Sequence, residues 1–325
     1  MERDAIWVFC EPAPEGVRGV SLELLGEAAR LSRAAGRPVV AVAPGTRASA
    51  EELCALGADE ALLFGDASLD APEELRYADE LCALIREFAP SILLLGATSF
   101  GRSLAPRVAA RLGCGLTADC TRLEIDERSG LLLQTRPALG GNLLATIVCP
   151  EARPQMATVR PKVFPMPARD AARPVRATRR DALFAPSTVE PLGLRAGAAG
   201  VNLADYDVLV CVGQGIGGAE NIARAQLLAE RLGGTLAATR AMVDAGAMPY
   251  ARQVGQTGKA VAPKLYIALG VSGAIQHMAG VSAQTIVCVN TDPDAPIFAG
   301  ADFGLVQDCG AFLDEALRAL DAQEA

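Results

Sequence analysis

Histidine is nearly absent from this 325-residue sequence, which has only one, and its nine cysteines include no C-x-x-C pair. A Cys/His zinc finger is therefore excluded. Most of the cysteines lie in apolar stretches such as LVCVG (209–213) and IVCVN (286–290), which is typical of reduced thiols in a cytosol-like compartment. The N-terminal stretch MERDAIWVFCEP leaves no room for a signal or transit peptide, so we expect a cytoplasmic protein.

Aromatic residues and long apolar runs are also scarce. Phe, Trp and Tyr make up 4% of the sequence although hydrophobic residues make up 51%, so the core must be built from Ala, Leu, Val and Ile. The apolar runs are interrupted by glycine and fall far short of the ~20 residues that a membrane span needs. The net charge is −8, whereas a nucleic-acid binder needs a basic face. We therefore expect neither a membrane span nor nucleic acid as the main partner.

What the sequence does contain is a repeated alternation of short apolar runs with amphipathic stretches. It begins with AIWVF (5–9), the amphipathic stretch 21–36 and PVVAVAP (38–44), a rhythm typical of parallel βαβ units. Residues 121–149 alternate polar and apolar side chains around turn signals, which predicts added antiparallel strands. A second rhythm begins at YDVLVCVG (206–213). We predict an α/β fold of two domains, each a mainly parallel sheet with flanking helices, the second Rossmann-like.

A proline-rich basic segment separates the two rhythms. Residues 151–190 carry eight basic and four acidic residues, a net charge of +4 within an acidic protein. Prolines at positions 154, 161, 165, 167, 174 and 186 remove backbone donors and favour extended conformations in the residues before them. We interpret residues 151–190 as an extended connector, which assigns residues 1–190 to an N-terminal domain and residues 191–325 to a C-terminal domain.

The first glycine-rich loop of the second half, at 213–218, fits the pattern G-x-G-x-x-G. It follows the strand-like DVLVCV and precedes the helix-like AENIARAQLLAERLG, which is the context of a dinucleotide-binding turn. A nicotinamide site would need an acidic residue about 20 residues later, where Thr239 and Arg240 stand. Arg240 could instead meet a 2′-phosphate, so an NADP site stays open as an alternative.

Three further loops could contact a ligand. VGQTGK (254–259) ends like a phosphate loop, but Gln253 and Ala260 break the full pattern, so NTP hydrolysis is not expected. Residues 272–277 follow the strand-like LYIALG and offer free backbone N–H groups, a serine hydroxyl and the single histidine. Asn290 and Asp308 close the next two predicted strands, where they could equally be a turn residue and a helix cap.

All four loops lie at the carboxyl ends of predicted parallel strands, which is where open α/β sheets bind ligands. Together they predict a long ligand with a diphosphate. The sequence shows no Ser-His-Asp triad, metal-ligand cluster or paired carboxylates. We therefore predict no catalytic residues and no metal, and assign the chemistry to a bound cofactor.

The same stretches resemble the alpha-subunit family of electron transfer flavoproteins. The matching segments are TRAMVDAG (239–246), QVGQTGKAVAPKLYIALGVSGAIQHMAG (253–280) and IVCVNTDPDAPIFAGADFGLVQD (286–308), with PQMATVRP (154–161) in support. The resemblance runs along nearly the whole chain, is strong over residues 205–310, and rests mostly on layout in the first 150 residues. It implies FAD in the C-terminal domain and a beta subunit that completes a heterodimer.

The resemblance also implies a set of FAD-binding residues. It places Arg240 by the isoalloxazine ring, Thr257 near N5, and His277 at the N1 and C2 carbonyl edge. The remaining members are Gln214, Thr239, Val254, Gly255, Gln256, Ser272, Gly273, Ala274, Ile275 and Gln276 along the ribityl chain and diphosphate, and Asn290, Asp308 and Cys309 toward the adenosine end. Many family members have arginine where this sequence has Gln214, so that contact must be neutral here.

The implied function is electron transfer rather than turnover of a small substrate. The chain would shuttle electrons between a dehydrogenase, such as an acyl-CoA dehydrogenase of fatty acid beta-oxidation, and a downstream acceptor. One alternative is a bifurcating flavoprotein with a second FAD in the partner, which passes electrons from NADH to ferredoxin and an acyl-CoA. Two others are an NADP-dependent dehydrogenase and a non-redox nucleotide-binding module, and flavin content would distinguish both from the first two.

Overall fold

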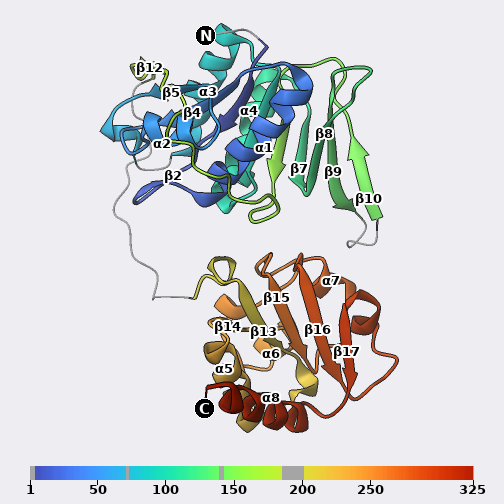
Figure 1. Ribbon diagram of the computed structural model, residues 1–325. Helices are drawn as coiled ribbons and strands as arrows, with labels where there is room; N and C mark the ends of the chain where they lie inside the picture. Colours follow the sequence, from blue (N-terminus) through green and yellow to red (C-terminus); the bar gives the residue numbers. More distant parts are fainter. Residues whose placement is uncertain (1–3, 71–72, 139–142, 185–200, 325) are drawn as a thin grey trace. The chain divides into compact units, whose positions relative to one another are not determined.

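The computed structural model describes residues 4–70, 73–138, 143–184 and 201–324 (Figure 1). These residues form two compact units, one containing residues 4–138 and 144–184 and the other residues 201–324. Each unit is built on a parallel sheet, so the predicted α/β fold class is confirmed. No helix within the described ranges is long and apolar enough to cross a membrane.

The first unit is built on a seven-stranded parallel sheet with the strand order β12-β5-β4-β1-β6-β11-β7. Its strands are β1 (Ile6–Phe9), β4 (Val39–Pro44), β5 (Glu60–Phe64), β6 (Ile92–Gly96), β7 (Leu116–Cys120), β11 (Gln155–Val159) and β12 (Ala177–Arg180). Its helices are α1 (Gly19–Ala35), α2 (Ala50–Ala55), α3 (Glu74–Phe88), α4 (Ser99–Leu112) and the 3₁₀ turn η1 (Ala67–Leu69), and a short hairpin joins β2 (Pro12–Ala13) to β3 (Gly16–Val17). The central strands are buried along their whole length, which explains their continuous apolar runs.

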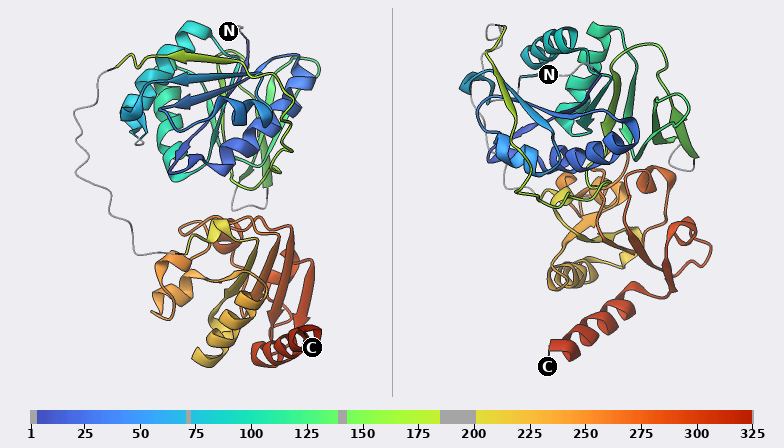
Figure 2. Two further views of the ribbon diagram at one scale, coloured as in Figure 1. Left: turned by 60° about the vertical axis from the view of Figure 1, so that its left-hand side comes forward. Right: turned by 45° about the horizontal axis from the view of Figure 1, so that its top comes forward.

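Helices cover both faces of this sheet (Figure 2). Successive residues of β1 point to opposite faces, as the two-residue period of a strand requires. Ile6 and Val8 pack in one apolar cluster with α1 and α2, whereas Trp7 and Phe9 pack in the other with α3 and α4. The α1 helix ends at Gly36, whose φ of 65° is the left-handed conformation that glycine adopts without strain.

The segment interpreted as a connector contributes two strands to the first unit. Residues 155–159 form β11, which is fully buried between β6 and β7, and residues 177–180 form β12 at the edge beside β5. The interpretation of residues 151–190 as a connector outside the core is therefore wrong for these strands. The prolines flank β11 rather than interrupt it, so every residue of QMATV keeps its backbone donor. Pro186 and the rest of residues 185–190 lie outside the described residues.

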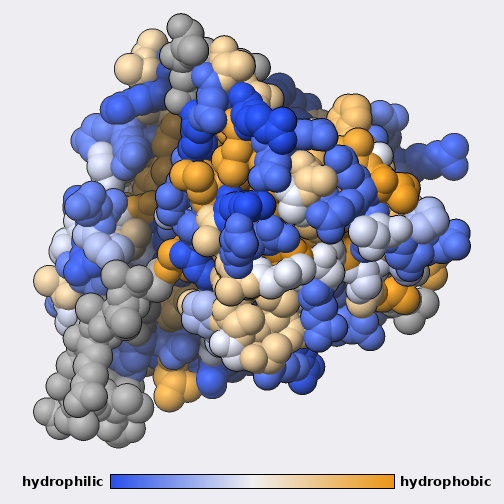
Figure 3. Space-filling view, turned by 90° about the horizontal axis from the view of Figure 1, so that it is seen from below, coloured by the Kyte–Doolittle hydropathy of each residue, from blue (hydrophilic) through white to orange (hydrophobic). Residues whose placement is uncertain are grey.

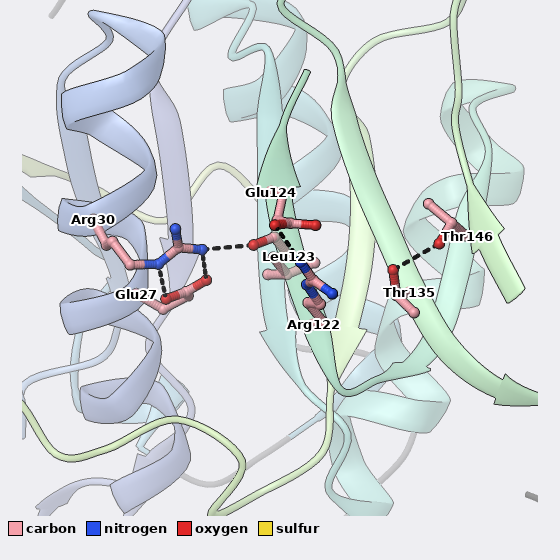
Figure 4. Close-up of polar contacts among 7 residues, drawn as sticks. All are labelled: Glu27, Arg30, Arg122, Leu123, Glu124, Thr135 and Thr146. Atoms are coloured by element: carbon pink, nitrogen blue, oxygen red, sulfur yellow. Dashed lines mark hydrogen bonds and ion pairs between the residues drawn. The ribbon is translucent and has the colours of Figure 1, made fainter. Parts of the chain in front are cut away.

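A small three-stranded sheet, with the order β10-β9-β8, extends the first unit. It comprises β8 (Arg122–Ile125), β9 (Leu132–Ala138) and β10 (Leu143–Ile147), and β8 pairs antiparallel with β9, as predicted. Figure 4 shows how polar contacts tie it together. Arg30 of α1 binds Glu27 and donates to the Leu123 carbonyl at 2.6 Å, and the hydroxyls of Thr135 and Thr146 lie 2.9 Å apart.

The second unit is built on a five-stranded parallel sheet with the order β14-β13-β15-β16-β17. Its strands are β13 (Val208–Val212), β14 (Thr235–Ala238), β15 (Leu265–Leu269), β16 (Thr285–Asn290) and β17 (Phe303–Val306). Its helices are α5 (Ala219–Arg231), α6 (Arg240–Asp244), α7 (Ile275–Met278) and α8 (Cys309–Glu324), with 3₁₀ turns η3 (Leu203–Asp205), η4 (Gln214–Ile216), η5 (Tyr250–Arg252) and η6 (Pro296–Gly300). The face seen in Figure 3 is mostly hydrophilic, with small separate apolar areas, as expected for a chain with 21% charged residues.

Two apolar clusters cover the two faces of the second sheet. On one face α5 and α8 pack against the strands through residues such as Leu228 and Leu313. On the other face the cover comes from loops rather than long helices, through residues such as Val254, Val261 and Ile297. Because loops form this second cover, their polar side chains stand next to the ends of the strands.

Candidate functional site

The loops that follow β13, β14, β15 and β16 enclose a cavity of about 690 Å³ in the second unit. That volume is within the usual range for small-molecule and cofactor sites. The cavity lies at the carboxyl edge of the parallel sheet, where the sequence predicts ligand binding. Its wall contains Gly213, Gln214, Gly215, Thr239, Arg240, Ala241, Asp244, Val254, Gly255, Gln256, Thr257, Gly270, Val271, Ser272, Ala274, Gln276, His277, Asn290, Asp292, Ala295 and Pro296.

Twelve of the sixteen predicted site residues line this one cavity. They come from four loops that are separated by up to about 75 residues of sequence, and they are Gln214, Thr239, Arg240, Val254, Gly255, Gln256, Thr257, Ser272, Ala274, Gln276, His277 and Asn290. The sheet order explains the convergence, because β14, β13, β15 and β16 are consecutive neighbours. The contact of each of these residues with a cofactor stays a prediction.

The other four predicted residues do not line the cavity. Gly273 has a φ of 84° and packs against the backbone of Ile297, so no Cβ fits there. The Ile275 side chain is 49% exposed and Cys309 is buried. Asp308 caps α8, because its Oδ1 accepts from the backbone N–H groups of residues 310 and 311 at 2.9 and 3.0 Å. Helix capping was the alternative role that the sequence left open for Asp308.

Several residues of the wall were not among the predicted site residues. They are backbone positions and small or acidic side chains, namely Gly213, Gly215, Ala241, Asp244, Gly270, Val271, Asp292, Ala295 and Pro296. Asp244 had a sequence signal, because it lies four residues after Arg240 and therefore on the same side of a helix. The others carry no chemical signature in the sequence.

Close backbone contact between two loops shapes the floor of the cavity. The Gly213 N–H donates to the Leu269 carbonyl at 2.9 Å, and the Gly215 N–H donates to the Gly270 carbonyl at 3.0 Å. A Cβ at Gly213 would overlap the Gly270 carbonyl oxygen. The glycines of the G-x-G-x-x-G motif therefore serve first to let two chain segments meet.

A buried hydroxyl at the wall lacks a partner. Thr239 precedes α6, and its Oγ1 is buried without a hydrogen-bond partner among the described residues. Buried polar atoms in native proteins are nearly always hydrogen-bonded. A ligand with polar atoms along its length would satisfy this hydroxyl, so the wall fits a cofactor of the predicted kind.

Two charged side chains stand on the same wall. Arg240 and Asp244 are both exposed, and the Arg240 Nε lies 3.2 Å from Asp244 Oδ2. An anionic group that approaches Arg240 would therefore also approach a carboxylate. The arginine attracts negative charge less strongly than it would alone.

The Thr257 hydroxyl is oriented by a buried amide. Gln253 is 3% exposed, and its Nε2 donates to Thr257 Oγ1 at 3.1 Å. The Tyr250 hydroxyl also donates to the Thr257 carbonyl at 3.0 Å, which fixes the loop from outside. Because Oγ1 already accepts a hydrogen bond, its own proton is left for a ligand.

The single histidine is buried at the back of the cavity. His277 is 7% exposed, its Nδ1 lies 3.2 Å from the Val254 carbonyl oxygen, and its Nε2 lies 2.9 Å from the Tyr266 hydroxyl. Burial lowers the pKa of the imidazole, and the bond to the Val254 carbonyl opposes that shift. Among the described residues there is no group of three or more His, Cys, Asp and Glu side chains that could hold a metal ion.

Comparison with known proteins covers both units. Residues 6–184 match the electron transfer flavoprotein domain, and residues 202–282 match the electron transfer flavoprotein FAD-binding domain. The electron transfer flavoprotein subunit alpha of Thermoanaerobacterium thermosaccharolyticum is 47% identical over 309 residues, 93% of each chain. The subunit alpha of Megasphaera elsdenii is 42% identical over 99% of this chain and 98% of its own.

A third relative has a different printed function. The subunit LctC of a lactate dehydrogenase (NAD(+),ferredoxin) from Acetobacterium woodii is 38% identical to this chain. The similarity covers 98% of this chain and 77% of that relative. Similarity over nearly the whole chain thus extends to proteins with more than one electron-transfer role.

Proposed function

Because the chain belongs to the electron transfer flavoprotein alpha-subunit family, we propose that it holds FAD in the cavity of its second unit and carries electrons between a dehydrogenase and a downstream acceptor. The observation that supports this most is the convergence of twelve predicted residues on one cavity at the carboxyl edge of the sheet. The cavity contains no arrangement for acid–base or nucleophilic chemistry on a small substrate. The chain is then an electron carrier.

The residues of the wall have the chemistry that FAD requires. FAD, when bound, supplies the capacity to accept and release electrons. Arg240 and Thr257 would hold the isoalloxazine ring, Ser272 and Gln276 the middle of the cofactor, and Asn290 the adenosine end. The protein binds and orients the cofactor, and the apolar wall excludes water from part of it.

We further propose that a beta subunit completes the carrier as a heterodimer in the cytoplasm. The relatives that share this chain's full length are themselves named as alpha subunits. An acyl-CoA dehydrogenase is the proposed donor. The net charge of −8 favours docking to basic surfaces of redox partners, and such docking should weaken with salt.

Flavin content of the heterodimer tests the proposal. The chain is co-expressed with its beta subunit, and the released cofactor is identified and counted per heterodimer. We expect FAD, with one molecule bound by this chain. A heterodimer that holds AMP without flavin would favour a nucleotide-binding module, and nicotinamide-dependent turnover without flavin would favour an NADP-dependent dehydrogenase.

The NADP alternative fits the structure less well. It would use Arg240 to bind a 2′-phosphate, but Asp244 lies 3.2 Å from that guanidinium on the same wall. A dianionic phosphate there would meet a carboxylate of the same sign. FAD has no phosphate at that position, so it avoids this repulsion.

A bifurcating carrier is the second candidate, favoured by the similarity to LctC over nearly the whole chain. The cavity described above accounts for one FAD, so a second would have to be held by the partner. Two FAD molecules per heterodimer, together with coupled reduction of ferredoxin by NADH, would support this candidate. One FAD per heterodimer would contradict it and leave the simple shuttle.

A further inference from the structure

Both ring nitrogens of His277 are engaged by the protein itself. Nδ1 faces the Val254 carbonyl at 3.2 Å, and Nε2 faces the Tyr266 hydroxyl at 2.9 Å. A carbonyl oxygen can only accept a hydrogen bond, so Nδ1 carries a proton. In a neutral ring Nε2 then has only a lone pair, and the Tyr266 O–H must donate to it.

The groups packed around the ring favour the neutral form. Tyr266 is fully buried on β15, and Cys211 on β13 has its Sγ 4.0 Å from Nε2. Burial raises the pKa of the Cys211 thiol to about 12 and raises that of Tyr266 well above its usual value, so both stay uncharged. The charged side chains on the wall of the same cavity are Arg240, Asp244 and Asp292.

We propose that Tyr266 is a positioning residue that holds His277 as a neutral imidazole with its proton on Nδ1 and its Nε2 already occupied. The family resemblance places His277 at the electron-rich edge of the flavin, where a donor or a cation would stabilise negative charge. A neutral ring whose Nε2 accepts from Tyr266 cannot donate from that nitrogen. The positive charge available on the cavity wall is then that of Arg240.

The proposal has one part that rests on the proposed function and one that does not. The tautomer is a property of this chain with or without cofactor. The consequence for the flavin is that His277 takes up no proton when the cofactor is reduced, and this part requires FAD in the cavity. The experiments below separate the two.

Nitrogen NMR of the imidazole tests the tautomer directly. The chain has a single histidine, so labelling it with ¹⁵N-histidine before assembly with unlabelled beta subunit gives one imidazole, and a labelled His277→Gln heterodimer verifies the assignment by loss of the signals. We expect a protonated Nδ1 and an unprotonated Nε2 throughout about pH 6 to 8, with and without FAD. A proton on Nε2, in either the neutral or the doubly protonated ring, would overturn the proposal.

Tyr266→Phe tests the role of the hydroxyl. Tyr77→Phe is the matched control, since Tyr77 is also fully buried and its hydroxyl donates to the Leu69 carbonyl in the other unit. We expect Tyr266→Phe to shift the Nε2 resonance and to steepen the rise of the FAD midpoint potential as the pH falls, while Tyr77→Phe changes neither. An unchanged Nε2 resonance in Tyr266→Phe contradicts the proposal. Should that variant fail to assemble, the wild-type tautomer decides, and a heterodimer without FAD refutes the proposed function but not the tautomer.

Discussion

Arg240 and Asp244 lie one turn apart on α6, with the guanidinium Nε 3.2 Å from a carboxylate oxygen, and both side chains line the cavity. They are 66% and 63% exposed, so solvent weakens the attraction between them. Their opposite charges act on the same part of a bound cofactor. The net field there is a difference between two effects, and each can be removed separately.

Arg240→Ala should lower the midpoint potential of the bound flavin, and Asp244→Asn should raise it. Reduction adds negative charge, which the guanidinium favours and the carboxylate opposes. At ~4 Å the interaction of two unit charges is about 1 kcal/mol in a water-like dielectric, and since a tenfold change corresponds to about 59 mV for one electron, each shift should be roughly 40 mV. Redox titration of the purified heterodimers measures both.

Arg224→Ala is the control for this pair of variants. Arg224 forms the same type of i,i+4 ion pair with Glu220, at 2.6 Å on α5, but neither residue lines the cavity. Its removal should leave the midpoint potential unchanged. A midpoint that also stays unchanged in Arg240→Ala would show that the guanidinium does not act on the flavin.

Thr257→Val should weaken FAD binding while the fold is kept. The substitution retains the shape of the side chain but removes the hydroxyl that Gln253 orients toward a ligand. Loss of one hydrogen bond costs about 1 kcal/mol, or roughly fivefold in the dissociation constant. FAD titration of the apo-heterodimer measures it. Thr257→Ser should bind like the wild type, and equal affinities of the valine and serine variants would refute the role of the hydroxyl.

Gly213→Ala should destabilise the second unit and reduce its flavin content. The added Cβ would overlap the Gly270 carbonyl, so the two loops that form the cavity floor would have to move apart. Overpacking of this kind typically costs about 1–3 kcal/mol. Urea unfolding monitored by flavin release measures the loss. Gly300→Ala is the control, because its Cβ would come no closer than 3.5 Å to the flexible end of Met278.

Glu11 should make the first unit's stability depend on pH. The residue is 3% exposed, and burial raises the pKa of its carboxyl, against the hydrogen bond from Thr98 and the ion pair with Arg18. A raised pKa in the folded state means that protonation favours folding. The stabilisation is complete below the unfolded-state pKa and is lost as the pH rises through the folded-state value.

Glu11→Gln removes that titration. The free energy of unfolding of the wild type, relative to this variant, should therefore fall between about pH 4 and pH 7. Denaturant unfolding at several pH values measures the difference. Glu127→Gln, at an exposed position outside the strands, is the control. A wild-type advantage that grows with pH would show that the ion pair with Arg18 outweighs burial.

Much of the fold could be predicted because its strands are buried on both faces. VVAVAP and LYIAL are continuous apolar runs of strand length, and such runs leave few alternatives. β11 was misassigned because QMATV contains Gln155 and Thr158 and stands between prolines at 154 and 161. Its central place depends on pairing with β6 and β7, which are distant in the sequence and leave no local signal.

The site could be predicted to a similar degree, for a related reason. Loops that follow parallel strands meet at one edge, so Thr239, Thr257 and Asn290 converge once the strands are known. The packing of Gly215 on Gly270 and the bond from Tyr266 to His277 could not be predicted. Both depend on the relative depth of side chains across neighbouring strands, which only the folded structure fixes.

The position of β11 has a consequence for how the chain is made. β7 precedes it in the sequence, yet β11 lies between β6 and β7 in the sheet. A ribosome that has released residues up to 120 has supplied both neighbours but not the strand that separates them, and synthesis proceeds at only about 5–20 residues per second. The nascent chain must therefore keep a slot open in its main sheet for several seconds, and the hairpin of β8 and β9 is completed during that interval.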